Sequence, residues 1–380
     1  MRILTYAVAI IMMVVFVIGM NACSPYLEGD SNTEVITSDS DTNAPSPSAE
    51  VTTSESDTGT PPPPPISQAL AYKVNTDGET CKIVGMGTYT DTDINIPSTI
   101  DGYRVTAIGN SAFYYCDNLT SITIPDSVTT IGDEAFHDCS SLKSITIPKS
   151  VAYIGDEAFF SCGSLESVTV QEGNPIYHSA GNCLIETESK TLILGCNNSV
   201  IPDDKSVTSI GDWAFNQCKG LRLIAIPDSV TSIGDGAFYE CINLMPKYAL
   251  IPQSVTVIGE YAFYACESLA SVEVPDNVTT VGKYAFSNCN NLMSVTLGNK
   301  VQSINEYTFA GCINLVSLKI GYAVKNIGEY AFKGCVKLET ISYPRGTGPE
   351  WRLIKKASTW ALDVPATKVI CYDGTTSLNR

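Results

Sequence analysis

A repeat of 23 residues limits what this chain can fold into more than any other feature of its sequence. The motif A-F-x-x-C-x-x-L occurs in nine copies, one of which has Thr308 in place of the first Ala. From each phenylalanine to the next, the steps are 23, 23, 56, 23, 25, 23, 23 and 23 residues. Nine copies in phase predict a stack of similar units, each packed on the next. The phenylalanines are Phe113, Phe136, Phe159, Phe215, Phe238, Phe263, Phe286, Phe309 and Phe332.

Within one unit, apolar residues recur with the spacing of short strands. Residues 142–147 end in apolar positions two apart, and Pro148 then prevents further ladder pairing. Residues 151–155 indicate a second extended piece, and residues 156–159 a single helical or 3₁₀ turn. One unit alone buries too little apolar surface to offset the entropy of ordering it. We therefore expect a right-handed repeat solenoid whose short parallel strands lie about 4.8 Å apart.

Three positions depart from the repeat, and one interval is longer. Gly298 and Gly321 replace the turn proline, which still permits a turn. Asn305 replaces the glycine that otherwise follows the second strand, and asparagine tolerates the left-handed conformation that we expect there. The 56-residue step equals two units plus ten residues and contains two apolar runs, residues 183–185 and 191–194. These runs predict a β-hairpin.

The cysteine that follows each phenylalanine forms a second in-phase column, from Cys116 to Cys335. An exported protein could use such residues as disulfides. Nine side chains that all point inward instead favour a ladder of buried thiols, since an odd number cannot all pair. Any disulfide is then expected among the cysteines outside the column, which are Cys81, Cys183, Cys196 and Cys371.

The whole repeat pattern, L-x-x-I-x-I-P-x-S-V-x-x-I-G-x-x-A-F-x-x-C, resembles the BspA-like, Treponema-type leucine-rich repeats of bacterial surface proteins. The resemblance covers about residues 70–374. Residues 72–97 are similar to that family's N-terminal capping hairpins, and residues 346–374, with Trp351 and Trp360, to its C-terminal cap. The resemblance implies a leucine-rich repeat solenoid with a cap at each end. It also implies an extracellular module that binds proteins or mediates adhesion.

The N-terminal segment predicts export. An apolar run from Ile3 to Gly19 is followed by Met20-Asn21-Ala22-Cys23, which resembles the lipobox of bacterial lipoproteins and implies lipidation of Cys23. An uncleaved membrane anchor is the alternative. The following residues, up to Ile66, include eight acidic residues and no Lys or Arg, which predicts a disordered tether.

We thus expect five regions along the chain. They are a signal peptide at 1–22, a tether at 23–66, an N-terminal cap with the first coil at 67–112, repeats at 113–342 and a C-terminal cap at 343–380. The hairpin insertion is expected at about 171–206.

Three groups of residues are candidates for ligand contact. The first lies on the exposed face of the first strand and comprises Thr120, Thr123, Lys143, Thr146, Glu166, Thr169 and Arg222. The second precedes Ala-Phe and comprises Trp213, Tyr261, Tyr284, Tyr307 and Tyr330, either as rings packed on one another or as a ridge for a glycan or an apolar strip of a partner. The third, Tyr177 and His178, falls in the interrupted unit. His137 and His178 are interpreted as surface histidines without metal-binding partners.

Composition excludes several classes of function. The net charge of −17 argues against nucleic-acid binding, which needs a basic face. Two histidines and no C-x-x-C pair leave little material for catalysis or zinc binding, so we predict no enzyme, metal or cofactor. We expect a monomeric protein that is lipid-anchored at the bacterial cell surface, touches the membrane only through its lipid, and binds an extracellular protein or glycan. A surface spacer is the alternative.

Overall fold

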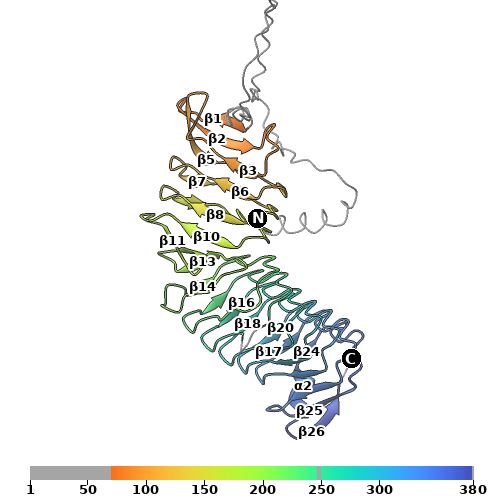
Figure 1. Ribbon diagram of the computed structural model, residues 1–380. Helices are drawn as coiled ribbons and strands as arrows, with labels where there is room; N and C mark the ends of the chain where they lie inside the picture. The colour runs from red at the N-terminus through yellow and green to blue at the C-terminus, as the bar shows by residue number, and fades with distance from the viewer. Residues whose placement is uncertain (1–69, 246–249, 379–380) are drawn as a thin grey trace, which may run out of the picture.

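The computed structural model describes residues 70–245 and 250–378. In these ranges the chain forms a β-solenoid of about 11 turns with a single short helix (Figure 1). The expected signal peptide at 1–22, the lipidation site Cys23 and the tether at 23–66 lie outside the described residues. Within the described ranges, no helix has the length and apolar character that crossing a membrane requires.

The first strand of each coil joins a parallel column along one side of the stack. Equivalent residues pair directly, so Ile145 lies opposite Val168, and Val295 opposite Leu318. This in-register pairing puts alternate apolar side chains of each strand, one or two per strand, into the core. The column consists of β3 (Asp93–Asn95), β6 (Ser121–Thr123), β8 (Ser144–Ile147), β10 (Ser167–Val170), β17 (Ser271–Glu273), β19 (Ser294–Thr296), β21 (Ser317–Lys319), β23 (Thr340–Tyr343) and β25 (Lys368–Cys371).

The second strand of each coil forms another parallel column, in which Ile210, for example, pairs with Ile233. Its members are β2 (Thr80–Gly85), β5 (Tyr103–Ile108), β7 (Thr130–Ile131), β9 (Tyr153–Ile154), β14 (Ser209–Ile210), β15 (Ser232–Ile233), β16 (Val257–Ile258), β18 (Thr280–Val281), β20 (Ser303–Ile304), β22 (Asn326–Ile327) and β24 (Lys355–Lys356).

The glycine after this second strand is not left-handed, contrary to the expectation from the sequence. It is needed because successive coils approach closely: a Cβ on Gly155 would lie 2.4 Å from the backbone nitrogen of Asp133. Asn305 replaces this glycine and donates from Nδ2 to the Val281 carbonyl at 2.6 Å.

The segment that carries each phenylalanine is a series of turns rather than the helical turn indicated by the sequence. Ser111, Phe113 and Tyr115 donate backbone N–H groups to carbonyls of the next coil at 2.8, 2.8 and 2.9 Å. Ser111 and Tyr115 have φ values of 53° and 56°, and the same two positions are left-handed in all nine repeats. Alternate N–H groups therefore point along the stack and pair with the neighbouring coil.

The core is a stack of phenylalanine rings lined by thiols. Neighbouring rings lie 5.0–5.6 Å apart and within 4–6° of parallel. Behind them, the thiol of Cys139 donates to the Phe113 carbonyl at 3.1 Å, and that of Cys266 to the Phe238 carbonyl at 3.2 Å. The predicted inward ladder of thiols is confirmed, and every cysteine in the described residues is buried and forms no disulfide.

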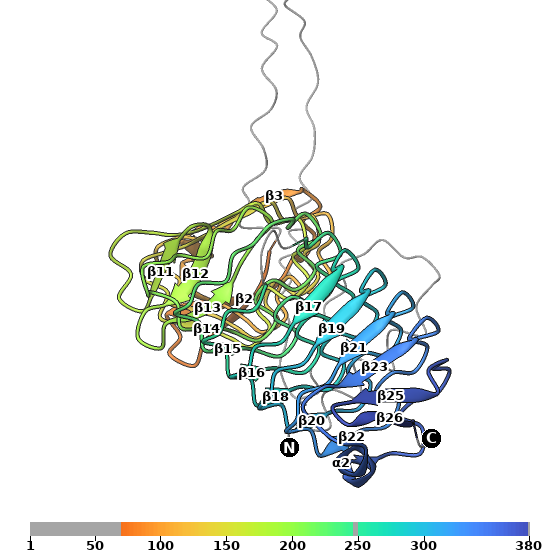
Figure 2. The same cartoon turned by 90° about the horizontal axis from the view of Figure 1, so that it is seen from below.

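The long interval is filled by an antiparallel sheet of β11 (Tyr177–Ala180), β12 (Cys183–Glu186) and β13 (Thr191–Leu194), which includes the predicted hairpin. β13 then pairs in parallel with β14 and restarts the second column. Two hydrophobic cores meet here, because Leu184 packs into the N-terminal core and Ile185 into the C-terminal one. Figures 1 and 2 show that the coils after the insertion stack in a different direction from those before it.

We call residues 70–170 the N-terminal arm and residues 207–245 with 250–378 the C-terminal arm.

Antiparallel strands cover both ends of the stack. β1 (Ala71–Val74) pairs with β2, and β4 (Thr99–Ile100) with β5. At the other end, β26 (Gly374–Ser377) pairs with β25. The helix α2 (Gly348–Leu353) begins with a capping box between Thr347 and Glu350. Buried Trp360 meets the last phenylalanine, Phe332, edge to face with ring centroids 6.0 Å apart.

Candidate functional site

The outward side chains of the first strand column form a continuous surface on each arm, which we call the strand face. On the N-terminal arm, Thr123, Thr146 and Thr169 are exposed, and the hydroxyls of the last two lie 2.9 Å apart. Lys143 and Glu166 are also exposed, with Nζ and Oε1 separated by 3.9 Å. The structure thus brings these predicted residues together on one face.

The edge of this face near β3 is ordered by hydroxyl groups. Thr120 donates to Oδ1 of Asp93 at 3.0 Å, and Ser121 donates to the same oxygen at 2.6 Å. Ser121 and then Thr120 hold the pKa of the Asp93 carboxyl below its usual value. Asp93 is therefore an ionised group at this end of the face.

Arg222 was predicted to lie on the strand face, but it lies outside the two regular parts of the strand column. Its segment, residues 222–226, forms no strand in the structure and lies between β10 and β17, where the column is interrupted. Arg222 is exposed, and its carbonyl accepts a hydrogen bond from the Met245 nitrogen at 2.8 Å. The insertion next to it changes the stacking direction, which separates this coil from the two regular parts of the column.

On two adjacent coils of the C-terminal arm, the repeat position equivalent to Lys143 and Glu166 carries exposed apolar residues. Met293 is 54% exposed and Val316 39% exposed, one directly before β19 and the other directly before β21. Two exposed apolar side chains on adjacent coils form a strip that contacts solvent. The sequence analysis missed this strip, although the change from charged to apolar residues at one repeat position was its signal.

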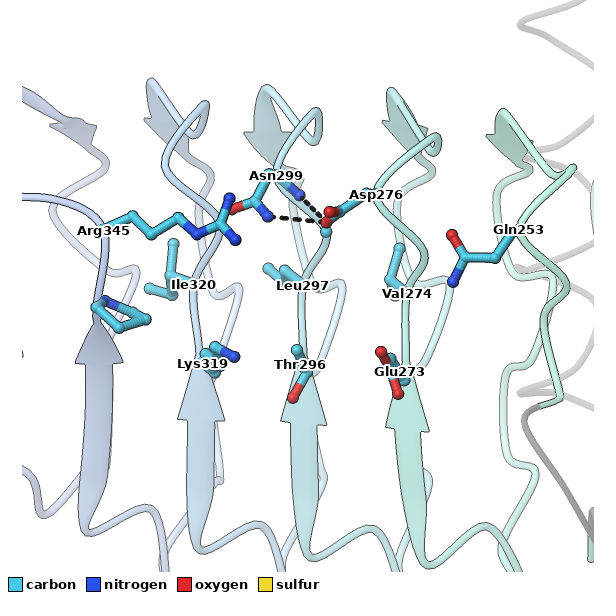
Figure 3. Close-up of a pocket in the computed structure, with 12 residues that line it drawn as sticks. Gln253, Glu273, Val274, Asp276, Thr296, Leu297, Asn299, Lys319, Ile320 and Arg345 are labelled. Carbon is cyan, nitrogen blue, oxygen red and sulfur yellow. Dashed lines mark hydrogen bonds between the residues drawn. The ribbon is translucent and has the colours of Figure 1, made fainter.

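A depression of about 220 Å³ lies at the opposite ends of the same strands. Glu273, Thr296 and Lys319 lie along its strand side, and Asp276, Asn299 and Arg345 along its turn side (Figure 3). The backbone and side-chain nitrogens of Asn299 both donate to Oδ1 of Asp276 at 2.9 Å.

The depression has an acidic and a basic end. Figure 3 shows Arg345 extending from the turn after β23 to the side of Asn299, which lies between Arg345 and Asp276. The hydrogen bonds from Asn299, and then the charges of Arg345 and Lys300, hold the pKa of the Asp276 carboxyl below its usual value. Glu273 and Asp276 thus face Lys319 and Arg345 across neighbouring coils.

Gly298 and Gly321, the glycines that replace the turn proline, lie where neighbouring coils approach closely. Gly298 lines the depression, and a Cβ on Gly298 would lie 2.1 Å from the Pro275 carbonyl oxygen. A Cβ on Gly321 would lie 2.1 Å from the Gly298 carbonyl oxygen. The sequence interpretation, that glycine merely permits a turn, omitted this close approach of backbone to backbone.

The aromatic residues before Ala-Phe form a ladder on the C-terminal arm. Tyr261, Tyr284, Tyr307 and Tyr330 stack with centroid distances of 4.7, 4.6 and 5.0 Å. Burial raises the pKa of Tyr261 to about 12. Trp213 is not part of the stack, because its ring meets Phe160 and Tyr239 edge to face.

The stacking of the tyrosine rings limits which ligands the ladder can bind, because it determines which ring faces are accessible. A sugar packs its C–H groups on the electron-rich face of an aromatic ring. In Tyr284 and Tyr307 both faces are covered by neighbouring rings, so only ring edges and hydroxyls point outward. This geometry favours rings packed on one another over a glycan-binding ridge.

The comparisons with known proteins agree with the repeat geometry. A family model for the BspA type leucine rich repeat region matches six copies, at residues 106–194, 192–247 and 246–348, which is more than half of the chain. The chain belongs to the BspA-type leucine-rich repeat family. No curated protein matches it.

Solved structures share the fold of this BspA-type chain. The pneumococcal vaccine antigen PcpA superposes with a TM-score of 0.61 at 25% identity, covering 71% of this chain and 66% of the antigen, so the chain spans just under two thirds of that protein. A leucine-rich repeat protein from Eubacterium ventriosum superposes with a TM-score of 0.52 at 24% identity, covering 81% of this chain and 93% of the other. These matches indicate no enzyme family.

The two predicted ligand contacts in the insertion of this BspA-type chain, Tyr177 and His178, differ in how far they are buried. Tyr177 is wrong as a ligand contact, because it is only 4% exposed and its hydroxyl accepts a hydrogen bond from the Ile154 nitrogen at 3.1 Å. It joins the insertion to the preceding coil. His178 is half-buried, and its Nδ1 lies 2.9 Å from the Thr187 hydroxyl oxygen across the hairpin.

Proposed function

We propose that the chain is a non-catalytic recognition protein of the bacterial surface, which holds an extended segment of an extracellular protein along its strand face. The depression between Asp276 and Arg345 is the observation that carries this proposal. Family membership supports a repeat surface used for binding, and the vaccine antigen among the solved relatives is consistent with a surface-exposed protein.

The geometry of the C-terminal arm suggests what the partner segment looks like. Met293 and Val316 lie directly before the strands, and the depression lies where the strands end. Three-residue strands separate the two by about 10 Å. A segment with apolar side chains over the strip and charged side chains about 10 Å away would match both features. The N-terminal arm presents a separate strand face, which carries threonine hydroxyls.

The size of the depression supports docking over catalysis. Pockets that enclose a small molecule usually measure about 300–1,000 Å³. At about 220 Å³, this depression has room for one or two side chains of a partner. The ionised Asp276, which accepts two hydrogen bonds from Asn299, is not poised as a general acid.

The cysteines are also unsuited to catalysis. A nucleophilic cysteine needs a lowered thiol pKa and access to its substrate. Here burial raises the pKa of Cys289 and Cys335 to about 12. The thiol ladder is therefore a part of the core.

The segment before the solenoid supplies the attachment to the membrane in this proposal. A lipid on Cys23 would anchor the chain, and the 43 residues from Ser24 to Ile66 would act as a tether with a random-coil end-to-end distance of about 35 Å. The membrane is then contacted only through the lipid, and the strand face stays available to a partner.

Binding of the full-length protein to immobilised host matrix proteins, whole bacteria and bacterial polysaccharides tests the proposal. We expect saturable binding to a protein, weakened about tenfold or more in Lys319→Glu/Arg345→Glu, because like charges then crowd the depression. Lys73→Glu/Lys190→Glu changes the net charge equally, at exposed positions outside the strand face, and should bind like the wild type. Binding to none of these probes would favour the spacer, and loss of polysaccharide binding in Tyr284→Ser/Tyr307→Ser would favour the glycan-binding module.

A further inference from the structure

Three potential metal ligands meet on the N-terminal arm, far from the depression. Glu134 and His137 belong to one coil, and Glu157 to the next. One ligand atom of each lies within 4.8 Å of the others, and no other such group occurs in the described ranges. The two glutamates occupy the repeat position that carries tyrosines on the C-terminal arm. The sequence analysis interpreted His137 as a surface histidine and missed these two neighbouring carboxylates.

The imidazole of His137 is held firmly in place. Its ring lies between Tyr114 and Phe160, with centroid distances of 4.7 and 4.6 Å. Only 13% of the side chain is exposed. These contacts fix the ring plane, so Nδ1 points towards Glu157 and Nε2 towards Asp138.

The Nδ1 atom of His137 is close to a carboxylate but makes no hydrogen bond with it. Nδ1 is buried and has no hydrogen-bond partner in the described part of the chain. It lies 4.0 Å from Oε2 of Glu157, well beyond the range of about 2.7–3.2 Å for a hydrogen bond. A tetrahedral ion with bonds of about 2.0–2.2 Å holds two of its ligand atoms about 3.3–3.6 Å apart, so a small rotation of the Glu157 side chain would bring Oε2 and Nδ1 to that spacing.

Neighbouring side chains orient the His137 imidazole and the Glu134 carboxylate. Oδ2 of Asp138 lies 3.3 Å from Nε2 of His137, and a carboxylate on one ring nitrogen leaves the other free to bind a metal. Ser111 donates to Oε2 of Glu134 at 3.2 Å and orients that carboxylate.

The electrostatic balance of the group also favours a cation. The ligand atoms of Glu134 and Glu157 lie within 4.8 Å of each other on neighbouring coils. Stacked carboxylates on adjacent coils repel each other, and a divalent cation between them would relieve the repulsion.

We propose that Glu134, His137 and Glu157 bind a divalent transition-metal ion of the Zn²⁺ class, which ties two neighbouring coils together. One imidazole nitrogen and two carboxylate oxygens suit Zn²⁺, whereas Ca²⁺ and Mg²⁺ prefer six or more oxygen ligands. Three protein ligands leave a fourth position for water.

Titration of the full-length protein with ZnCl₂, followed by calorimetry, tests the site. We expect one saturable site whose affinity falls about tenfold or more in Glu157→Gln. His178→Asn removes the other histidine of the chain and should bind Zn²⁺ like the wild type. Circular dichroism establishes that each variant is folded. Equal affinity in Glu157→Gln and the wild type would overturn the proposal.

Imidazole NMR provides a second measurement that does not depend on a variant of the site. The chain has two histidines, and His178→Asn assigns their signals. Zn²⁺ should shift the His137 signals and leave those of His178 in place, whereas Ca²⁺ should shift neither. Zn²⁺ bound only by acidic groups elsewhere would leave the His137 signals unchanged, and that result would overturn the proposal.

Discussion

At the residue scale, the tyrosine ladder occupies a backbone conformation that residues other than glycine rarely adopt. Tyr261, Tyr284, Tyr307 and Tyr330 have φ values of 55–57°. Such a conformation costs a residue with a Cβ about 1–2 kcal/mol. Ring stacking, worth about 0.5–1.5 kcal/mol per pair, and an N–H bond to the next coil offset this cost. The Tyr307 nitrogen, for example, donates to the Glu329 carbonyl at 3.0 Å.

This balance predicts an unusual order of variants at Tyr307. Both Tyr307→Ala and Tyr307→Gly lose two ring contacts, but only glycine relieves the left-handed backbone. We expect Tyr307→Gly to be more stable than Tyr307→Ala by about 1 kcal/mol, the reverse of the usual preference. Urea unfolding measures the difference. Greater stability of the alanine variant would contradict the strain argument.

The buried thiols predict a loss of stability at alkaline pH. A free thiol titrates near pH 8.5, whereas burial raises the pKa of Cys289 and Cys335 to about 12. Above pH 8.5 the unfolded chain releases protons that the native state keeps, so stability falls as pH rises towards 12. Each thiol contributes at most about 1.4 kcal/mol per pH unit.

Urea unfolding of the wild type and of Cys289→Ala/Cys335→Ala at pH 7, 8.5 and 10 measures this effect. The variant is expected to be less stable at pH 7, because it has lost buried atoms, and to lose less stability between pH 8.5 and 10. An equal loss in both proteins over that interval would show that these thiols do not titrate on unfolding.

At the element scale, the insertion joins two cores that are otherwise separate. Successive side chains of β12 point to opposite faces of its sheet, as they do in any strand. Leu184 therefore packs with the N-terminal core and Ile185 with the C-terminal core. One hairpin strand thus serves both arms.

Alanine variants at these two positions should destabilise different arms. Each is expected to cost about 2–5 kcal/mol, since both side chains are fully buried. Hydrogen exchange should show faster exchange chiefly in residues 70–170 for Leu184→Ala and chiefly in residues 207–378 for Ile185→Ala. The same pattern in both variants would mean that the arms unfold as one unit.

At the scale of the whole molecule, the stability of a stack is a sum over neighbouring coils, so the terminal coils need cover. Trp360 covers Phe332, and β25 occupies the edge of β23 by pairing Val369 with Ile341. Removing these contacts exposes an apolar ring and an unpaired strand edge.

Deletion of residues 344–380 should therefore produce dimers or larger assemblies, because exposed strand edges pair with other chains. Size-exclusion chromatography with light scattering measures the mass. Deletion of residues 379–380 alone serves as the control and should behave like the full chain. A monomeric protein after the larger deletion would show that the last coil needs no cover.

The stack could be predicted from the sequence because nine copies repeat the same apolar pattern. The left-handed turns could not, since pairing with the next coil, rather than local preference, fixes their backbone. The depression combines Asp276, Asn299 and Arg345, which come from separate coils, and the only local sign of it was glycine in place of proline. His137 and Glu157 lie 20 residues apart, and only the stacking of their coils brings them together.

The thiol ladder also has a consequence for how the chain matures. Its cysteines contribute as packed side chains and hydrogen-bond donors, so folding needs no oxidase and no isomerase to sort cysteine pairs. Dithiothreitol should leave the melting temperature unchanged, and the folded protein should persist equally in anoxic and oxygenated habitats.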